Sequence, residues 1–113
     1  AVKRLGAAKG YADYVEMLDK EKPQFASVCP RWADCHRDML IACAERGVNV
    51  YLEKPVARNL VEADEMVAAT EKHHVKVAVA HQTRSAPRTQ RVKELIAAGT
   101  AIAVTQLLEA GAS

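Results

Sequence analysis

The tripeptide Glu53-Lys54-Pro55 places a carboxylate and an ammonium side by side at the end of an apolar run. A carboxylate can accept hydrogen bonds from ribose hydroxyls, and an ammonium can donate to a substrate oxygen or assist its deprotonation. Pro55 biases Lys54 toward an extended backbone, so the two charged side chains should point to opposite sides. From these residues alone, the alternative is a surface ion pair at a strand end.

Polar residues follow two further apolar runs, in the segments Cys29-Pro30-Arg31 and His81-Gln82-Thr83-Arg84. Gln82 and Arg84 could hydrogen-bond a carboxamide or a phosphate, or they could lie in a solvated loop. His36 stands in the first turn of an expected helix, where a neutral imidazole could touch a ribose or lie half-buried. These segments are therefore the remaining candidates for a ligand site.

The aromatic, basic, cysteine and histidine residues elsewhere in the chain give weaker indications of a ring-stacking, nucleic-acid or metal site. Trp32, the only tryptophan, could stack on an adenine or nicotinamide ring, or pack a helix N-terminus against a sheet. The basic segment 84–93 lacks interleaved aromatic residues, so we expect no nucleic-acid partner. The cysteine and histidine spacings do not match zinc ligands, so we expect no metal site.

Composition limits the class of protein. Half of the 113 residues are hydrophobic and 27% are charged, which is typical of a globular domain rather than a disordered chain. The net charge of +2 does not indicate an acidic partner. No apolar run approaches the roughly 20 residues that span a bilayer, so we expect no membrane partner. The three cysteines form no C-x-x-C pair, which favours a reducing, cytoplasmic location.

Helical and strand patterns alternate along the chain, which predicts βαβ units and a mostly parallel sheet. Capping residues Asp13 and Asn59 mark two helix starts. Because the strands are apolar runs, both sheet faces should be covered. Ligands bind beyond the carboxyl ends of such strands, so the polar segments above should meet at one edge. The expected strands are 25–29, 48–52, 75–80 and 102–108, with helices at 33–46, 60–73 and 87–98.

In this order, the segments resemble the Gfo/Idh/MocA oxidoreductase family over nearly the whole chain. The segment Ala12–Leu18 resembles the family's y-x-D-y-x-x-M-L helix, and Phe25–Pro30 resembles its fourth strand with a proline turn. Val50–Pro55 resembles the strand that ends in the E-K-P signature. The remaining matches are the loop histidine His36, Ala42–Gly47, Leu60–Thr70, Val77–Arg84 and Val92–Gly99.

The resemblance implies an α/β fold: a partial Rossmann-like, doubly wound parallel sheet that lacks the first strands. Residues 1–84 would be the C-terminal part of an NAD(P)-binding Rossmann domain, and residues 85–113 the start of an α/β substrate domain. The full-length protein would be a cytoplasmic, homo-oligomeric dehydrogenase. It would transfer hydride between NAD or NADP and a carbinol carbon of a sugar, cyclitol or related polyol.

The resemblance also implies roles for individual residues. Glu53 would hold the nicotinamide ribose, and Lys54 would be catalytic, lying between the nicotinamide and the substrate. The expected cofactor contacts at the other strand ends are Cys29, Pro30, Arg31, His36, Pro55, Gln82 and Arg84.

The chain departs from the family pattern at two places. Cys29-Pro30-Arg31 replaces T-P-N, and His36 lies six residues after Pro30 instead of four, which leaves the roles of Arg31 and Trp32 open. No G-x-G-x-x-G is present, so we expect this chain alone to bind the cofactor weakly and to be inactive. A non-catalytic nucleotide-binding or interaction module that retains the half-fold is the alternative, followed by an unrelated βαβ nucleotide-binding domain.

Overall fold

The structure is a computed structural model that describes residues 2–99. The chain divides after Ala80 into two compact units. The first contains helix α1 (Val2–Leu5) and the α/β part of the chain, and the second contains the 3-10 helix η2 (Gln82–Ser85) and helix α5 (Pro87–Ala97). The strand expected at 102–108 lies outside the described residues.

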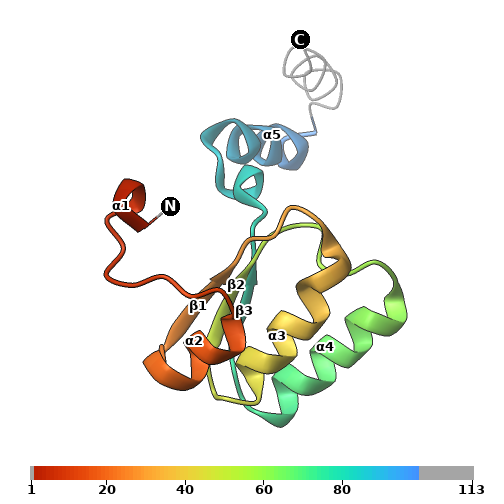
Figure 1. The fold of residues 1–113 in the computed structure, drawn as a ribbon. Coiled ribbons are helices and arrows are strands. Elements are labelled where there is room, and N and C mark those ends of the chain that lie inside the picture. The colour runs from red at the N-terminus through yellow and green to blue at the C-terminus, as the bar shows by residue number, and fades with distance from the viewer. Residues whose placement is uncertain (1, 100–113) are drawn as a thin grey trace. The chain divides into compact units, whose positions relative to one another are not determined.

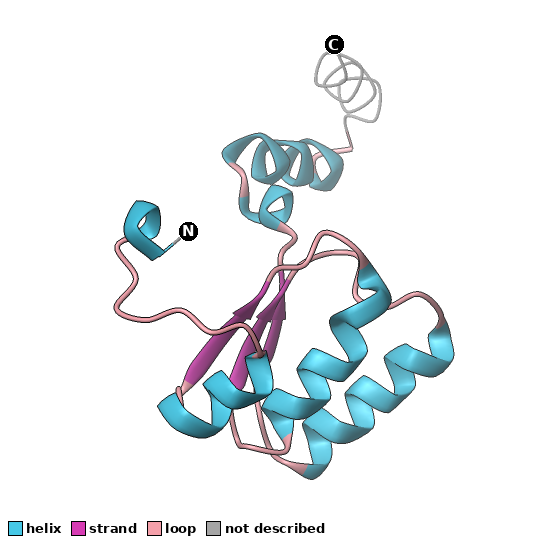
Figure 2. Ribbon diagram, viewed as in Figure 1, coloured by secondary structure: helices cyan, strands magenta, loops and turns pink. Residues whose placement is uncertain are grey.

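The first unit is built on a three-stranded parallel sheet with the order β1-β2-β3. In register, Phe25 pairs with Asn49, and Val50 pairs with Val77. Helices pack side by side against one face of the sheet (Figures 1 and 2). This arrangement confirms the predicted α/β fold with parallel βαβ units. The elements are α2 (Tyr14–Glu21), β1 (Phe25–Val28), α3 (His36–Ala44), β2 (Asn49–Leu52), α4 (Leu60–Lys72) and β3 (Val77–Val79).

The hydrophobic core lies between the sheet and these helices. Val50 and Leu52 of β2 are buried against Leu40 of α3 and Met66 of α4. Alternate residues of the strands point to the opposite face, where Phe25 remains 58% exposed. The expectation that both faces are covered is therefore not met within residues 2–99, where the helices pack against one face.

The ends of the helices follow from local hydrogen bonds. An Asp13 carboxylate oxygen accepts a hydrogen bond from the Val15 backbone N–H (2.9 Å), and Asn59 Oδ1 accepts one from the Glu62 N–H (3.0 Å). Both predicted caps are confirmed. The helix expected over 33–46 is instead a 3-10 turn, η1 (Ala33–Cys35), followed by α3. This division makes His36 the first residue of α3.

The free edge of the sheet predicts self-association. Among the described strands, β1 pairs only with β2, so its outer backbone groups can template another strand. We expect the 113-residue chain to associate with increasing concentration, and Phe25→Lys to reduce the association by placing a charge on this edge. Light scattering after size-exclusion chromatography measures the effect. Leu60→Lys, on a residue 82% exposed in α4, is the control, and a monomeric wild type at all concentrations would contradict the prediction.

A buried carboxylate anchors the start of α4. Glu62 is only 5% exposed, and its carboxylate accepts hydrogen bonds from Arg58 Nε (2.8 Å) and from the Arg58 backbone N–H (3.0 Å). The Arg58 guanidinium and backbone amide hold the pKa of Glu62 below its ordinary value. The carboxylate therefore stabilises the folded state only while it is ionised.

This lowered pKa gives a pH-dependent stability. The contribution of Glu62 is fully present above its ordinary pKa of 4.5 and is lost as the pH falls through the lower pKa of the folded state. We expect Glu62→Gln to lower Tm at neutral pH and the difference from wild type to shrink in acid. Thermal unfolding followed by circular dichroism at several pH values measures this. Glu65→Gln, which removes a carboxylate in an exposed pair with Arg37, should change Tm little at any pH.

Candidate functional site

Two of the polar segments lie at the carboxyl edge of the sheet. Pro30 and Arg31 follow β1, and Glu53 and Lys54 follow the parallel neighbour β2. The Glu53 N–H donates a hydrogen bond to the Val28 carbonyl oxygen (2.8 Å), which continues the pairing of the two strands to their ends. Glu53 is half-buried and Lys54 is exposed. The structure thus places the E-K-P segment beside the proline turn.

The His36 side chain contacts both of these segments. Its ring is fully buried, with Nδ1 2.7 Å from the Pro55 carbonyl oxygen and Nε2 3.0 Å from the Pro30 carbonyl oxygen. Since carbonyl oxygens only accept, each contact is a hydrogen bond when the facing ring nitrogen carries a proton. The sequence left two interpretations of His36 open, a ribose contact or a half-buried position in the helix. In the structure its ring nitrogens face protein carbonyls, and the geometry favours a role in positioning the two turns.

A groove of about 660 Å³ opens over these turns. The Arg31 guanidinium carbon lies 5.1 Å from the centre of the Trp32 ring, and Trp32 is 68% exposed. Sequence reasoning did not select Arg58, although its spacing of four residues from Glu62 at a helix start signals an ion pair. Basic and aromatic groups together can bind phosphates and planar rings. The groove is lined by Arg31, Trp32, Ala33, Lys54, Pro55, Ala57 and Arg58.

Six of the predicted contacts lie outside this groove's lining: Pro30, His36 and Glu53, described above, and Cys29, Gln82 and Arg84. Cys29 is exposed at the end of β1, with its Sγ 2.9 Å from Ser27 Oγ. Gln82 and Arg84 are exposed in η2 of the second unit, where the Arg84 carbonyl oxygen accepts a hydrogen bond from Gln90 Nε2 (2.7 Å). Their roles toward a ligand stay predictions.

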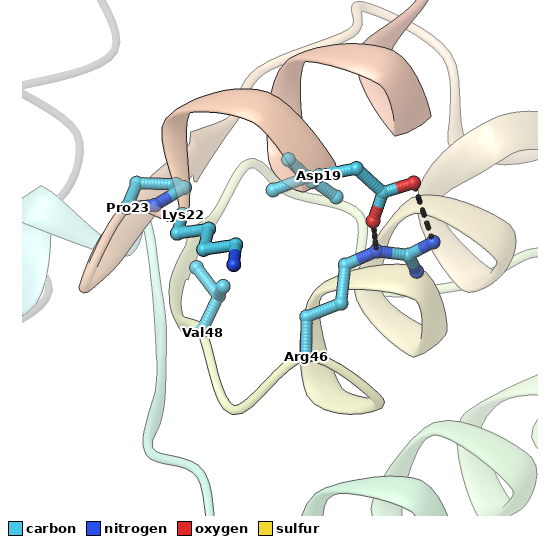
Figure 3. A pocket seen from close by; sticks show the side chains of 6 residues that line it. Asp19, Lys22, Pro23, Arg46 and Val48 are labelled. Atoms are coloured by element: carbon cyan, nitrogen blue, oxygen red, sulfur yellow. Dashed lines mark hydrogen bonds and ion pairs between the residues drawn. The ribbon is translucent and has the colours of Figure 1, made fainter.

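A smaller hollow of about 240 Å³ lies at the opposite end of the strands (Figure 3). Asp19 on α2 faces Arg46, with 2.6 Å between Asp19 Oδ1 and Arg46 Nε. The hydrogen bond from Arg46 lowers the pKa of the Asp19 carboxyl from its ordinary value. Arg46 also donates to the Ala42 carbonyl oxygen, so the pair ties α2 to the end of α3. The hollow contains no residue that the sequence selected for chemistry.

Metal sites and membrane-spanning helices are both absent from residues 2–99. No group of three or more histidine, cysteine or acidic side chains is arranged to hold a metal ion there. None of the helices in that range is long and apolar enough to cross a membrane.

Comparison with known proteins identifies relatives along most of the chain. Residues 1–81 match an oxidoreductase family described by its NAD-binding Rossmann fold. The myo-inositol 2-dehydrogenase of Thermotoga maritima is 30% identical over 97 residues, which cover 86% of this chain and 29% of that enzyme. The chain therefore spans less than a third of that relative's length.

Solved structures agree with this assignment. Myo-inositol 2-dehydrogenase from Lactobacillus plantarum is similar with a TM-score of 0.79 and 27% identity, over 88% of this chain and 29% of that chain. Levoglucosan dehydrogenase in complex with NADH and levoglucosan is similar with a TM-score of 0.77 and 26% identity, over 87% and 26%. The chain belongs to the Gfo/Idh/MocA family of oxidoreductases.

Proposed function

We propose that the complete protein containing this chain is an NAD-dependent dehydrogenase that acts on a carbinol carbon of a sugar, cyclitol or related polyol. One observation carries the proposal: Glu53 and Lys54 follow β2 at the carboxyl edge of the parallel sheet, and Lys54 lines the groove there. Ligands of open parallel sheets bind beyond this edge. The names of two relatives, a myo-inositol dehydrogenase and a levoglucosan dehydrogenase, support this substrate class.

The residues at this edge fit the nicotinamide half of a dinucleotide. The half-buried Glu53 carboxylate can accept hydrogen bonds from ribose hydroxyls, and the groove offers an exposed ring and basic side chains. The sequence contains no G-x-G-x-x-G segment that would place a diphosphate on a helix N-terminus. The residues at this edge therefore account for binding of the nicotinamide half of the cofactor.

The proposed chemistry divides between Glu53 and Lys54. When bound, the nicotinamide supplies the site that accepts or releases the hydride. During oxidation of the carbinol to a carbonyl, Lys54 would take the proton that the substrate hydroxyl releases. In reduction the Lys54 ammonium returns that proton to the oxygen. Glu53 fixes the cofactor ribose, and His36 holds the two turns together.

The proposal extends to the organisation of the chain. Residues 1–84 would form part of the cofactor domain, and residues 85–113 would begin the substrate domain. The division of the chain into two units after Ala80 supports a change of domain near this point. Gln82 and Arg84 would then lie in the segment that connects the two domains, near the nicotinamide end of the cofactor.

The experiment is an oxidation assay of the purified complete protein with NAD⁺. Myo-inositol, levoglucosan and common aldoses are supplied one at a time, and NADH formation is followed by absorbance. NAD⁺-dependent oxidation of a polyol or sugar supports the proposal. Failure to bind NAD⁺ in calorimetry, together with no oxidation of any tested carbinol, would overturn it.

A further inference from the structure

Trp32 is largely exposed to solvent. It is the only tryptophan of the 113 residues, and 68% of its surface is accessible. It precedes the 3-10 turn η1 and lines the same groove as Lys54. A large apolar ring left in water forgoes the hydrophobic stabilisation that burial would give. Its place in a groove, beside polar side chains, is the setting in which proteins bind small ligands.

The surroundings of Trp32 favour a planar ring as that ligand. The Arg31 guanidinium lies over the indole at 5.1 Å from its centre, within the range of a cation–π contact. This contact backs the indole on one side and helps to hold its orientation. Two further basic residues, Lys54 and Arg58, line the groove. An aromatic platform beside basic groups is the chemistry that recognises nucleotides, whose bases stack and whose phosphates carry negative charge.

We infer that Trp32 is a stacking platform for the nicotinamide ring, with Arg31 as the group that backs it. The inference rests on the proposed function, because Lys54 lies in the same groove and is assigned to the reacting end of the cofactor. Trp32 therefore contacts the nicotinamide half of the dinucleotide and not the adenine half. This assignment gives a binding role to the segment after β1, where Cys29-Pro30-Arg31 replaces the T-P-N of the family pattern and where the role of Trp32 was left open.

Two ligands that differ at the nicotinamide test the inference. NAD⁺ carries the ring, whereas ADP-ribose keeps the adenosine, both phosphates and the second ribose but lacks it. Each is titrated into the complete protein, with affinity measured by calorimetry and tryptophan emission measured by fluorescence. Comparison with Trp32→Phe identifies the part of the emission that belongs to Trp32. We expect NAD⁺ to quench that part strongly and ADP-ribose to bind with much less quenching.

Variants at Trp32 distinguish the loss of a stacking contact from a general loss of ligand binding. Trp32→Leu should weaken NAD⁺ binding about tenfold, the scale of one lost ring-stacking contact, and leave ADP-ribose binding nearly unchanged. Trp32→Phe should keep most of the NAD⁺ affinity, because an aromatic face remains. Phe25→Leu is the matched control: this aromatic residue is also exposed, at 58%, but it lies in β1 and does not line the groove. It should change neither affinity.

The possible outcomes distinguish this inference from the proposed function. Unchanged NAD⁺ affinity in Trp32→Leu, or an equal loss for NAD⁺ and ADP-ribose, overturns the stacking role while NAD⁺ binding itself stands. Absence of NAD⁺ and ADP-ribose binding in wild type overturns both proposals. Circular dichroism confirms that each variant is folded. If Trp32→Leu is not folded, the quenching of Trp32 emission provides the test: equal quenching by NAD⁺ and ADP-ribose overturns the stacking role.

Discussion

We expect Lys54→Met to lower kcat of the proposed carbinol oxidation by the complete protein about 100-fold or more, the scale of one lost proton-transfer or oxyanion partner. Methionine keeps an unbranched chain of similar length but cannot donate or accept the proton at the carbinol oxygen. The interaction strengthens as charge develops on that oxygen, so its loss acts on the transition state more than on bound substrate. Steady-state kinetics measures kcat, and calorimetry should show NAD⁺ affinity changed much less.

Glu53→Gln is the complementary variant. An amide oxygen accepts more weakly than a carboxylate, so we expect this change to weaken NAD⁺ binding and to act less on kcat at saturating cofactor. Lys76→Met is a matched control, because Lys76 lies just before β3, at the opposite end of the strands, and is exposed. Near-normal kcat in Lys54→Met would make the catalytic assignment wrong and leave the lysine a structural or cofactor-binding role.

His36→Leu should destabilise the folded state by about 1–3 kcal/mol, the cost of one buried acceptor left unpaired, because an imidazole with a single N–H donates one hydrogen bond. The acceptor that loses its partner is the Pro30 or the Pro55 carbonyl oxygen, whichever faces that N–H. The variant should also lower kcat, since Lys54 precedes Pro55 and a displacement of about 1 Å can cost about 100-fold in rate. Denaturant unfolding measures the first effect.

Kinetics on folded protein separates the positioning role from simple loss of stability. At a temperature where His36→Leu is fully folded, a positioning role still lowers kcat, whereas a purely structural role leaves it unchanged. His36→Asn, which can keep one of the two contacts, should recover part of the activity. His73→Gln, at the C-terminal end of α4, is the control and should change stability by less than about 0.5 kcal/mol. A stable, fully active His36→Leu would contradict the prediction.

Much of the fold could be predicted from local signals in the sequence. Asp13 and Asn59 cap helices as expected, because a side-chain oxygen beside free backbone N–H groups needs no distant partner. Gly47, which directly follows the helix expected over 33–46, adopts a φ of 69°, which glycine tolerates without strain. Strands β1, β2 and β3 fall inside the predicted apolar runs. These signals depend on neighbours within a few residues.

Other features depended on contacts between distant segments. The spacing of His36 from Pro30 differs from the family pattern, and the sequence offered no indication that the ring lies between the carbonyls of Pro30 and Pro55. The turn η1 accommodates that spacing before α3 begins. Arg58 lines the groove and is paired with Glu62. In the sequence, the only sign of this pair is the spacing of four residues between Arg58 and Glu62. Coverage of the sheet faces likewise depends on tertiary packing, which apolar strand composition alone does not specify.

The charges around the groove also affect the speed of ligand capture. Among residues 2–99, neither Arg31 nor Lys54 forms an ion pair with a carboxylate, whereas Arg58 is paired with Glu62. The positive charges of these two side chains can draw a diphosphate-bearing ligand toward the groove before contact. At 0.1 M ionic strength such attraction is screened beyond about 10 Å. The association rate constant for the dinucleotide should therefore fall as salt rises, while its dissociation rate constant, which short-range contacts govern, changes much less.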